Sequence, residues 1–178
     1  QQTVAGLFWD RVHELGDAVM MRQKDLGIWR SFSWKEVGTI ATEIGAGLVS
    51  LGLQPGQVVS VLSNTNREWV WTDLGAQSMG AVVNGIYPTD AAEQVQYLCS
   101  DSDTRFLFVE DEEQLDKWLE MRERLPSVAR VIVYDMEGLS SFHDEQVMSL
   151  DALRELGRAH VASHPGLLKE RLASRGWQ

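Results

Sequence analysis

The sequence predicts an α/β fold, an open and mostly parallel sheet with helices on both faces, preceded by a helix and a β-hairpin. The first observation is that short apolar runs recur about two dozen residues apart, at 58–62, 81–83, 106–109 and 131–134. That interval fits one strand plus one crossover helix. The second observation is that the runs at 58–62 and 106–109 are almost entirely hydrophobic. Such runs are typical of strands that helices bury on both faces.

The N-terminal region is expected to form a helix and then a hairpin. Residues 3–15 place apolar side chains along one helical face, namely Val4, Leu7, Phe8, Val12 and Leu15. Residues 19–23 and 28–32 follow as two strands around a turn at 24–27 that ends in glycine. Trp29 and Trp34 bracket the exit of the hairpin, and we expect them to fasten it to the next helix.

A capping box at Ser33-Trp34-Lys35-Glu36 opens the next helix, which continues with helical spacing and ends at Gly52. Between the later strands we expect helices over 67–79, 91–100 and 112–125. The pairs Thr65/Glu68 and Asp90/Glu93 predict two further capping boxes, and the acidic run 110–113 suits the positive end of a helix dipole.

The organisation expected from this pattern has three parts. Residues 1–34 form the helix and hairpin, and residues 35–135 form a parallel, flavodoxin-like core. Residues 136–178 form a polar loop and a helical tail, with helices beginning at 150–156 and 164–172 and Pro165 near the start of the second.

Composition excludes several classes of function. The 178 residues carry 26 acidic against 16 basic side chains, a net charge of −10, which disfavours nucleic-acid binding through phosphates. The single cysteine, Cys99, excludes an internal disulfide and a cysteine-based zinc site, and is expected to be a buried thiol in a reducing cytoplasm. No window is long and apolar enough to span a membrane, and residues 1–20 carry charges unlike a signal peptide. Peripheral membrane contact and homo-oligomers stay open.

No metal centre is predicted. His160 and His164 are four residues apart, but Pro165 interrupts the helix that would align them. His143, Asp144 and Glu145 are expected in a solvated loop. Among the seven tryptophans, Trp69 and Trp71 are expected in the core and Trp118 partly exposed.

The turn Ser63-Asn64-Thr65-Asn66 is the first candidate site, because it follows a buried strand and precedes a helix. Open α/β sheets bind phosphates and cofactors at such turns, and a flavin site is one reading. The same residue types are also what plain helix capping requires.

The second candidate is the segment Asn84-Gly85-Ile86-Tyr87-Pro88-Thr89, which follows the second core strand. The glycine allows close approach of the backbone, and Tyr87 offers a ring with a polar tip. The alternative is a turn whose proline and threonine start the next helix.

Four phrases resemble the N-terminal part of the AMP-forming acyl-CoA synthetases, and most of all the long-chain fatty acid–CoA ligases. They are L-G-L-x-P-G at 51–56, N-x-x-E-W in a looser form at 64–69, G-A-V-V at 80–83 and I-Y-P-T at 86–89. The resemblance implies a parent protein that adenylates a fatty acid with Mg-ATP and then transfers the acyl group to coenzyme A. It also implies that Asn84, Tyr87 and Thr89 contribute to a cleft wall.

The family's Ser/Thr/Gly-rich phosphate loop has no counterpart in residues 1–178. We therefore expect the chain to be the N-terminal subdomain of such a ligase, inactive alone, with no catalytic residue, bound cofactor or metal of its own. Two alternatives stay open, a stand-alone flavodoxin-like binding module and a non-enzymatic interaction domain that pairs through its hairpin or a sheet edge.

Overall fold

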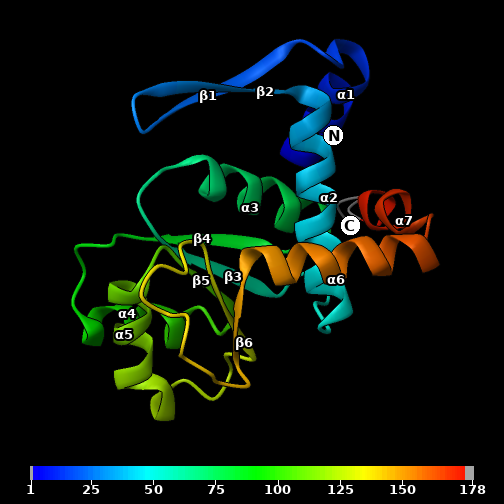
Figure 1. Ribbon diagram of the computed structural model, residues 1–178. Helices are drawn as coiled ribbons and strands as arrows, with labels where there is room; N and C mark the ends of the chain where they lie inside the picture. The colour runs from blue at the N-terminus through cyan, green and yellow to red at the C-terminus, as the bar shows by residue number, and fades with distance from the viewer. Residues whose placement is uncertain (1, 175–178) are drawn as a thin grey trace.

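A five-stranded parallel sheet forms the centre of the computed structural model, which describes residues 2–174 (Figure 1). Its strands stand in the order β4-β3-β5-β6-β7. Their bounds are β3 Val58–Leu62, β4 Val82–Ile86, β5 Thr104–Val109, β6 Arg130–Val133 and β7 Val147–Ser149. The predicted parallel α/β fold is thus confirmed, and the two most apolar runs, β3 and β5, are neighbours inside the sheet.

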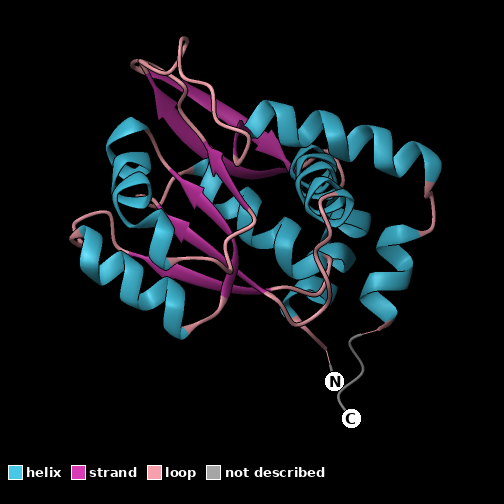
Figure 2. Ribbon diagram, turned by 90° about the horizontal axis from the view of Figure 1, so that it is seen from below, coloured by secondary structure: helices cyan, strands magenta, loops and turns pink. Residues whose placement is uncertain are grey.

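Helices cover both faces of this sheet (Figure 2). One face carries α1 Val4–Leu15, α2 Trp34–Ser50, α3 Arg67–Ser78, α6 Leu150–Ser163 and α7 Leu167–Ala173. The other carries α4 Ala92–Asp101 and α5 Glu112–Met121, which continues as a short 3-10 turn at Arg122–Arg124. Alternate residues of each strand supply the two cores, since Val59 and Phe108 join the first cluster while Leu62 and Leu107 join the second.

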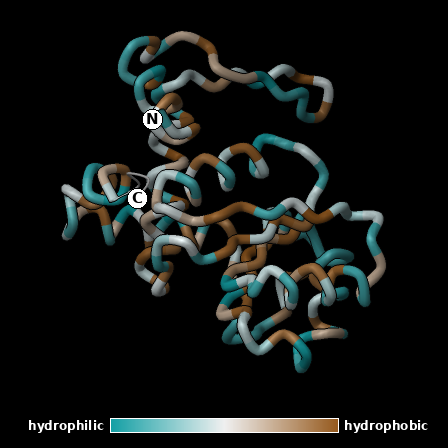
Figure 3. Tube along the Cα trace, turned by 180° about the vertical axis from the view of Figure 1, so that it is seen from behind, coloured by the Kyte–Doolittle hydropathy of each residue, from teal (hydrophilic) through white to brown (hydrophobic). Residues whose placement is uncertain are grey.

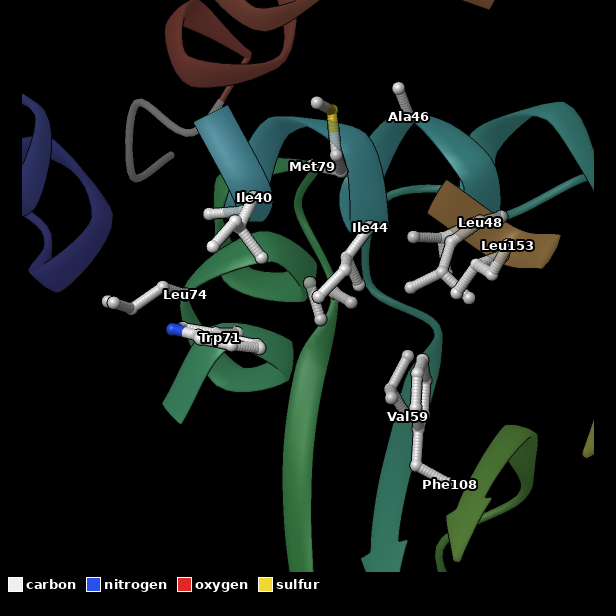
Figure 4. Close-up of a cluster of buried hydrophobic side chains, with 14 of the residues drawn as sticks. Ile40, Ile44, Ala46, Leu48, Val59, Trp71, Leu74, Met79, Phe108 and Leu153 are labelled. Atoms are coloured by element: carbon white, nitrogen blue, oxygen red, sulfur yellow. The ribbon is translucent and has the colours of Figure 1, made fainter. Parts of the chain in front are cut away.

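The larger core lies between α2, α3, α6 and the sheet (Figure 4). Ile44 and Leu48 of α2 are fully buried, and Trp71 of α3 and Leu153 of α6 pack into the same cluster. Trp9 of α1 fastens this layer by donating from Nε1 to Ser78 Oγ at 2.8 Å. Hydrophobic residues concentrate along the central strands (Figure 3).

Glycines let α2 approach its neighbours closely. A Cβ on Gly45 would lie 2.5 Å from the carbonyl oxygen of Gly75 in α3, and one on Gly75 would lie 2.6 Å from that of Ala41. On the other side, a Cβ on Gly157 of α6 would overlap the carbonyl oxygen of Glu43. Because glycine has no Cβ, the backbones of three helices can touch.

The antiparallel hairpin is β1 Val19–Asp25 and β2 Ile28–Ser33. Its turn is only Leu26 and Gly27, with φ of 47° and 83°, which is the positive-φ geometry of a tight hairpin turn. The turn is thus shorter than the predicted 24–27. The capping box after it is confirmed, since Glu36 N donates to Ser33 Oγ and Ser33 N donates to Glu36 Oε2.

The other two predicted capping boxes are wrong. Asn66 caps α3 in place of Thr65, and the Glu68 carboxylate pairs with Arg67. Helix α4 begins after Ala91 without a side-chain cap, so Asp90 does not serve. In each case the helix begins one residue later than the box requires.

Three side chains lie elsewhere than predicted. Trp29 is 64% exposed and does not belong to the larger core, whereas Trp34 packs near Phe8 with ring centroids 6.2 Å apart. Trp118 is 1% exposed, because it falls on the apolar face of α5. Asp144 is bound by Arg122 and is not a freely solvated group.

The described part of the C-terminal segment, residues 136–174, contains more regular structure than its sequence indicates. Strand β7 pairs in parallel with β6, and α6 packs along α2. Pro165 follows the end of α6 at Ser163, as predicted. Among the described residues, no helix is long and apolar enough to cross a membrane.

Candidate functional site

The carboxyl ends of β3, β5 and β6 meet at one edge of the sheet. From β3 the chain passes through α3 on one face to β4, and from β5 it passes through α5 on the other face to β6. The connections after neighbouring strands therefore diverge, which opens a crevice between them. Ligands of open α/β sheets bind in such crevices.

A cavity of about 350 Å³ occupies this position. It is lined at the start of α3 by Asn66, Arg67 and Glu68, after β5 by Glu110 and Asp111, and after β6 by Tyr134 and Asp135. The fold thus brings together loops that lie far apart in the sequence.

In the turn 63–66, the side chains of Ser63, Asn64 and Asn66 form hydrogen bonds within the protein. Asn66 Oδ1 accepts from Trp69 N at 2.9 Å, and Asn66 Nδ2 donates to Ser63 Oγ at 3.3 Å. The backbone N and side-chain Nδ2 of Asn64 both donate to Glu110 Oε2 at 2.9 Å. Helix capping, one of the two readings of this turn, is what the structure shows.

The charge of the cavity disfavours a phosphate. Four carboxylates line it, those of Glu68, Glu110, Asp111 and Asp135, against the single guanidinium of Arg67. That guanidinium is held by Glu68 at 2.8 Å and lies 3.7 Å from Asp25 of the hairpin. The phosphates of ATP or of a flavin nucleotide would bring further negative charge, which these carboxylates repel.

The tyrosine in the cavity is a structural group. Tyr134 shares a hydrogen bond of 2.6 Å with Thr72 Oγ1 of α3. Burial, with the nearby carboxylates of Glu68 and Glu110, raises the pKa of Tyr134 well above its usual range. The phenol therefore stays protonated at neutral pH and cannot serve as a base.

Metal binding finds no support in the described part of the chain, where no cluster of three or more histidine, cysteine, aspartate or glutamate side chains could hold an ion. His160 and His164 stack with ring centroids 4.2 Å apart at the end of α6. Burial and the neighbouring His164 and Arg171 lower the pKa of His160.

The three predicted cleft-wall residues come from β4 and the turn after it, and they separate into two environments. Asn84 is half-buried in the sheet, beside Ser60 in register, and its Nδ2 donates to Ser60 Oγ at 3.3 Å. Ser60 in turn shares a 2.6 Å hydrogen bond with Thr104, so Asn84 ends a row of polar side chains across three strands. Tyr87 is 77% exposed and Thr89 is exposed in the turn that follows.

Sequence reasoning missed the part played by Glu110. The acidic run 110–113 predicts only a helix terminus, but Glu110 directly follows β5 and accepts two hydrogen bonds from Asn64 in the turn after β3. A polar residue at the end of a buried strand was the available signal. The cap of α5 is Asp111, whose Oδ1 accepts from Gln114 N at 3.2 Å.

A second cavity, of about 360 Å³, lies away from this edge between α1, α2 and α6. Trp9, Val12, Gly38 and Val161 give it an apolar lining, and Lys35 and Arg158 add cations.

Comparison with known proteins identifies the family. The family model described as AMP-binding enzyme matches residues 8–166. The long-chain-fatty-acid–CoA ligase ACSBG1 of Bos taurus is 28% identical over 156 residues, which are 88% of this chain and 21% of that protein. The long-chain-fatty-acid–CoA ligase FadD15 of Mycobacterium bovis is 29% identical over 171 residues, 96% of this chain and 27% of that protein.

Solved structures share the fold. The crystal structure of the anthranilate CoA ligase AuaEII in complex with anthranoyl-AMP superposes with a TM-score of 0.74 at 21% identity, over 85% of this chain and 27% of that one. The chain thus spans only 21% to 27% of the length of these three proteins. With a family match over most of its residues and the same fold, the chain belongs to the family of AMP-binding enzymes, the AMP-forming acyl-CoA synthetases.

Proposed function

We propose that this chain is the N-terminal subdomain of a long-chain fatty acid–CoA ligase. The parent protein would convert a fatty acid, ATP and coenzyme A to acyl-CoA, AMP and diphosphate through an acyl-adenylate, with magnesium on the nucleotide. The observation that carries this proposal is that two curated relatives aligned with 88% and 96% of the chain are long-chain-fatty-acid–CoA ligases.

We further propose that the chain alone is inert. Adenylation needs cations around the phosphates and a carboxylate-held magnesium ion. The cavity at the sheet edge carries four carboxylates and one already paired arginine, so the nucleotide site would come from other parts of the parent. No step of the reaction is assigned to residues of this chain, and neither ATP nor CoA is expected to bind it in isolation.

The contribution of this chain would be a wall for the substrate. Tyr87 and Thr89 stand exposed beyond the end of β4, where a second surface of the parent could face them. Asn84 would hold the strand in place through Ser60 and would not touch the substrate. The cytoplasm would be the compartment, which suits the single buried thiol of Cys99.

The test compares residues 1–178 with the whole parent protein in the presence of palmitate, Mg-ATP and coenzyme A. We expect palmitate-dependent diphosphate release from the parent and none from residues 1–178. Release by residues 1–178 would overturn their inertness. A parent that activates only short or aromatic carboxylates would overturn the fatty acid assignment.

The wall is tested by Tyr87→Ala in the parent, with Tyr97→Ala as the matched control. Tyr97 is also exposed, at 58%, but lies on α4. Loss of an aromatic contact of about 1 kcal/mol should raise the KM for palmitate roughly fivefold with kcat little changed. Equal KM values for the two variants would remove Tyr87 from the wall.

A further inference from the structure

The tip of the hairpin carries apolar side chains that the fold leaves in solvent. Leu26 is 98% exposed, Ile28 68% and Trp29 64%. The hairpin extends beyond the body of the molecule, with hydrophobic and polar stretches following one another around its tip (Figures 1 and 3). Single exposed apolar residues are ordinary, but three within four residues at the end of a projecting element call for a physical reason.

The two faces of the hairpin differ. On the inner face, Met21 and Phe32 pack against the larger core, and Gln23 and Asp25 reach Arg67 of α3. Side chains alternate along a strand, so the outer face carries Arg22 and Lys24, with Trp29 directly across from Lys24 in the register. These three outer residues are all exposed.

The outer face is positively charged in a chain whose net charge is −10. Asp25 is the only acidic residue of the two strands, and it lies 3.4 Å from Arg30 and 3.7 Å from Arg67. Within the described residues, neither Arg22 nor Lys24 forms an ion pair. Two free cations thus stand directly behind an apolar tip.

We propose that this surface, the hairpin tip with Leu26, Ile28 and Trp29 backed by Arg22 and Lys24, binds an anionic lipid bilayer. The tip is convex and would enter a deformable surface. Tryptophan favours the interface between water and hydrocarbon, and basic side chains just above it are attracted to anionic headgroups.

The insertion is shallow. The turn at Leu26 and Gly27 exposes backbone amides and carbonyls that hydrocarbon cannot satisfy, so they remain at headgroup depth. A contact of this size gives weak and reversible binding, as for other single interfacial anchors. The assignment does not depend on which carboxylate the parent protein activates.

The test places a fluorophore at the tip. In a Leu26→Cys variant the new thiol can be labelled selectively, because Cys99 is fully buried and burial raises its pKa to about 11. With an environment-sensitive dye, we expect a blue shift on adding vesicles of phosphatidylcholine with about one quarter phosphatidylserine, and little shift with phosphatidylcholine alone.

Co-sedimentation of unlabelled protein with the same vesicles measures the charge contribution. Each cation near an anionic surface is worth about fivefold in partition, so Arg22→Gln with Lys24→Gln should weaken binding about 25-fold. The matched control is Arg124→Gln with Lys169→Gln, which removes the same charge from exposed sites on other elements. The control should bind as the unaltered protein does, and thermal unfolding verifies that both variants fold.

Several results would overturn the proposal. One is the absence of any blue shift, and another is equal loss of binding in the hairpin and control variants. A third is a protein that does not bind vesicles but forms a concentration-dependent dimer, which the substitution Trp29→Ser abolishes. That result would assign the tip to contact with a second copy of the chain. A ligase assay of the whole parent protein, in detergent without vesicles, tests the proposed function separately. The membrane proposal and the proposed function can therefore fail independently.

Discussion

At the scale of single residues, Arg122 shows how one side chain can join a helix to a distant loop. It donates from Nη1 to Asp144 Oδ2 at 2.6 Å and from Nη2 to Gln146 Oε1 at 2.6 Å, and its guanidinium lies 4.5 Å from the ring centroid of Trp118. These contacts tie the end of α5 to the loop before β7. The Arg122 guanidinium holds the pKa of Asp144 below its usual value of 3.8.

The lowered pKa gives a pH-dependent prediction. Because the unfolded chain binds a proton at Asp144 more readily than the folded one, the ion pair contributes stability above pH 3.8 that is lost as the pH falls through the lower folded pKa. Asp144→Asn should therefore be less stable than the unaltered chain near pH 7, and the difference should be smaller at a pH below 3.8. Urea unfolding at the two pH values measures it.

The control for this change is Asp116→Asn, because Asp116 is exposed on α5 and has no ion-pair partner among the described residues. It should alter stability little at either pH. A difference for Asp144→Asn that persists unchanged in acid would mean that the carboxylate charge is not its cause.

The environment predicted from the sequence was correct for some tryptophans and wrong for others. Trp71 and Trp69 pack in or against the core as predicted, whereas Trp29 is exposed and Trp118 buried. The three-residue steps from Leu115 to Trp118 to Met121 are a helical face that could have placed Trp118 correctly. No such pattern could place Trp29, because a hairpin strand exposes either face according to what packs beneath it.

At the scale of elements, α2 is the helix against which both α3 and α6 pack closely. Gly45 of α2 lies against Gly75 of α3, and the backbone of α2 at Glu43 lies against Gly157 of α6. Glu43 of α2 also binds Arg154 of α6 at 2.7 Å and Arg158 at 3.1 Å. Close backbone contact and ion pairing thus both join α2 to α6.

Gly157→Ala should destabilise the chain although alanine is the better helix former. Its Cβ would overlap the Glu43 carbonyl, a backbone atom that cannot turn aside. We expect a loss of about 2 kcal/mol or more, because overpacking costs about 1–3 kcal/mol and the gain in helix propensity is at most about 1 kcal/mol. Equilibrium urea unfolding gives the value.

Gly166→Ala is the matched control for this glycine. Gly166 has φ of −89°, and a Cβ there would meet no atom within 4 Å. A change within about 0.5 kcal/mol is expected. Equal destabilisation by both substitutions would mean that the close contact of α2 and α6 is not the cause.

Regular elements were predictable where their pattern repeats. The strands β3, β4, β5 and β6 and the helices between them follow from apolar spacing that fits a single architecture. Strand β7 was not predicted, because three half-buried residues carry no period and their pairing with β6 is decided by the fold. The caps at Asn66 and Ala91 show the same limit, since a cap depends on where the chain bends.

At the scale of the whole molecule, the two cores have the sheet in common. The first cluster lies under α2, α3 and α6 and the second under α4 and α5, and the same strands β3, β5 and β6 supply both. Because both cores use the same strands, unfolding of those strands on one side would expose the core on the other side. Unfolding should therefore be a single cooperative event.

Leu153→Ala and Leu115→Ala test this from opposite faces. Both leucines are fully buried, the first on α6 and the second on α5. Each substitution should cost about 2–5 kcal/mol and lower one shared transition, observed by both tryptophan fluorescence and circular dichroism. Two separate transitions in either variant would show that the faces unfold independently.

The candidate site was less predictable than the fold. Its position after β3 follows from the general behaviour of parallel sheets, and of the predicted turn Ser63-Asn64-Thr65-Asn66 only Asn66 lines the cavity. Its chemistry was not predictable, because Glu110, Arg67 and Asp135 meet there only through folding. The role of Asn84, Tyr87 and Thr89 in a cleft wall stays a prediction.

Arg67 couples the hairpin mechanically to the edge of the sheet. Its backbone N donates to Gln23 Oε1 at 2.7 Å, its guanidinium lies 3.7 Å from Asp25 and 5.7 Å from the ring centroid of Phe32, and its Nε binds Glu68. The first turn of α3, which borders the acidic cavity, is therefore tethered to a projecting arm. A displacement of that arm would therefore reach the rim of the cavity through the contacts of Arg67 and through Phe32, which packs on Trp71 of α3.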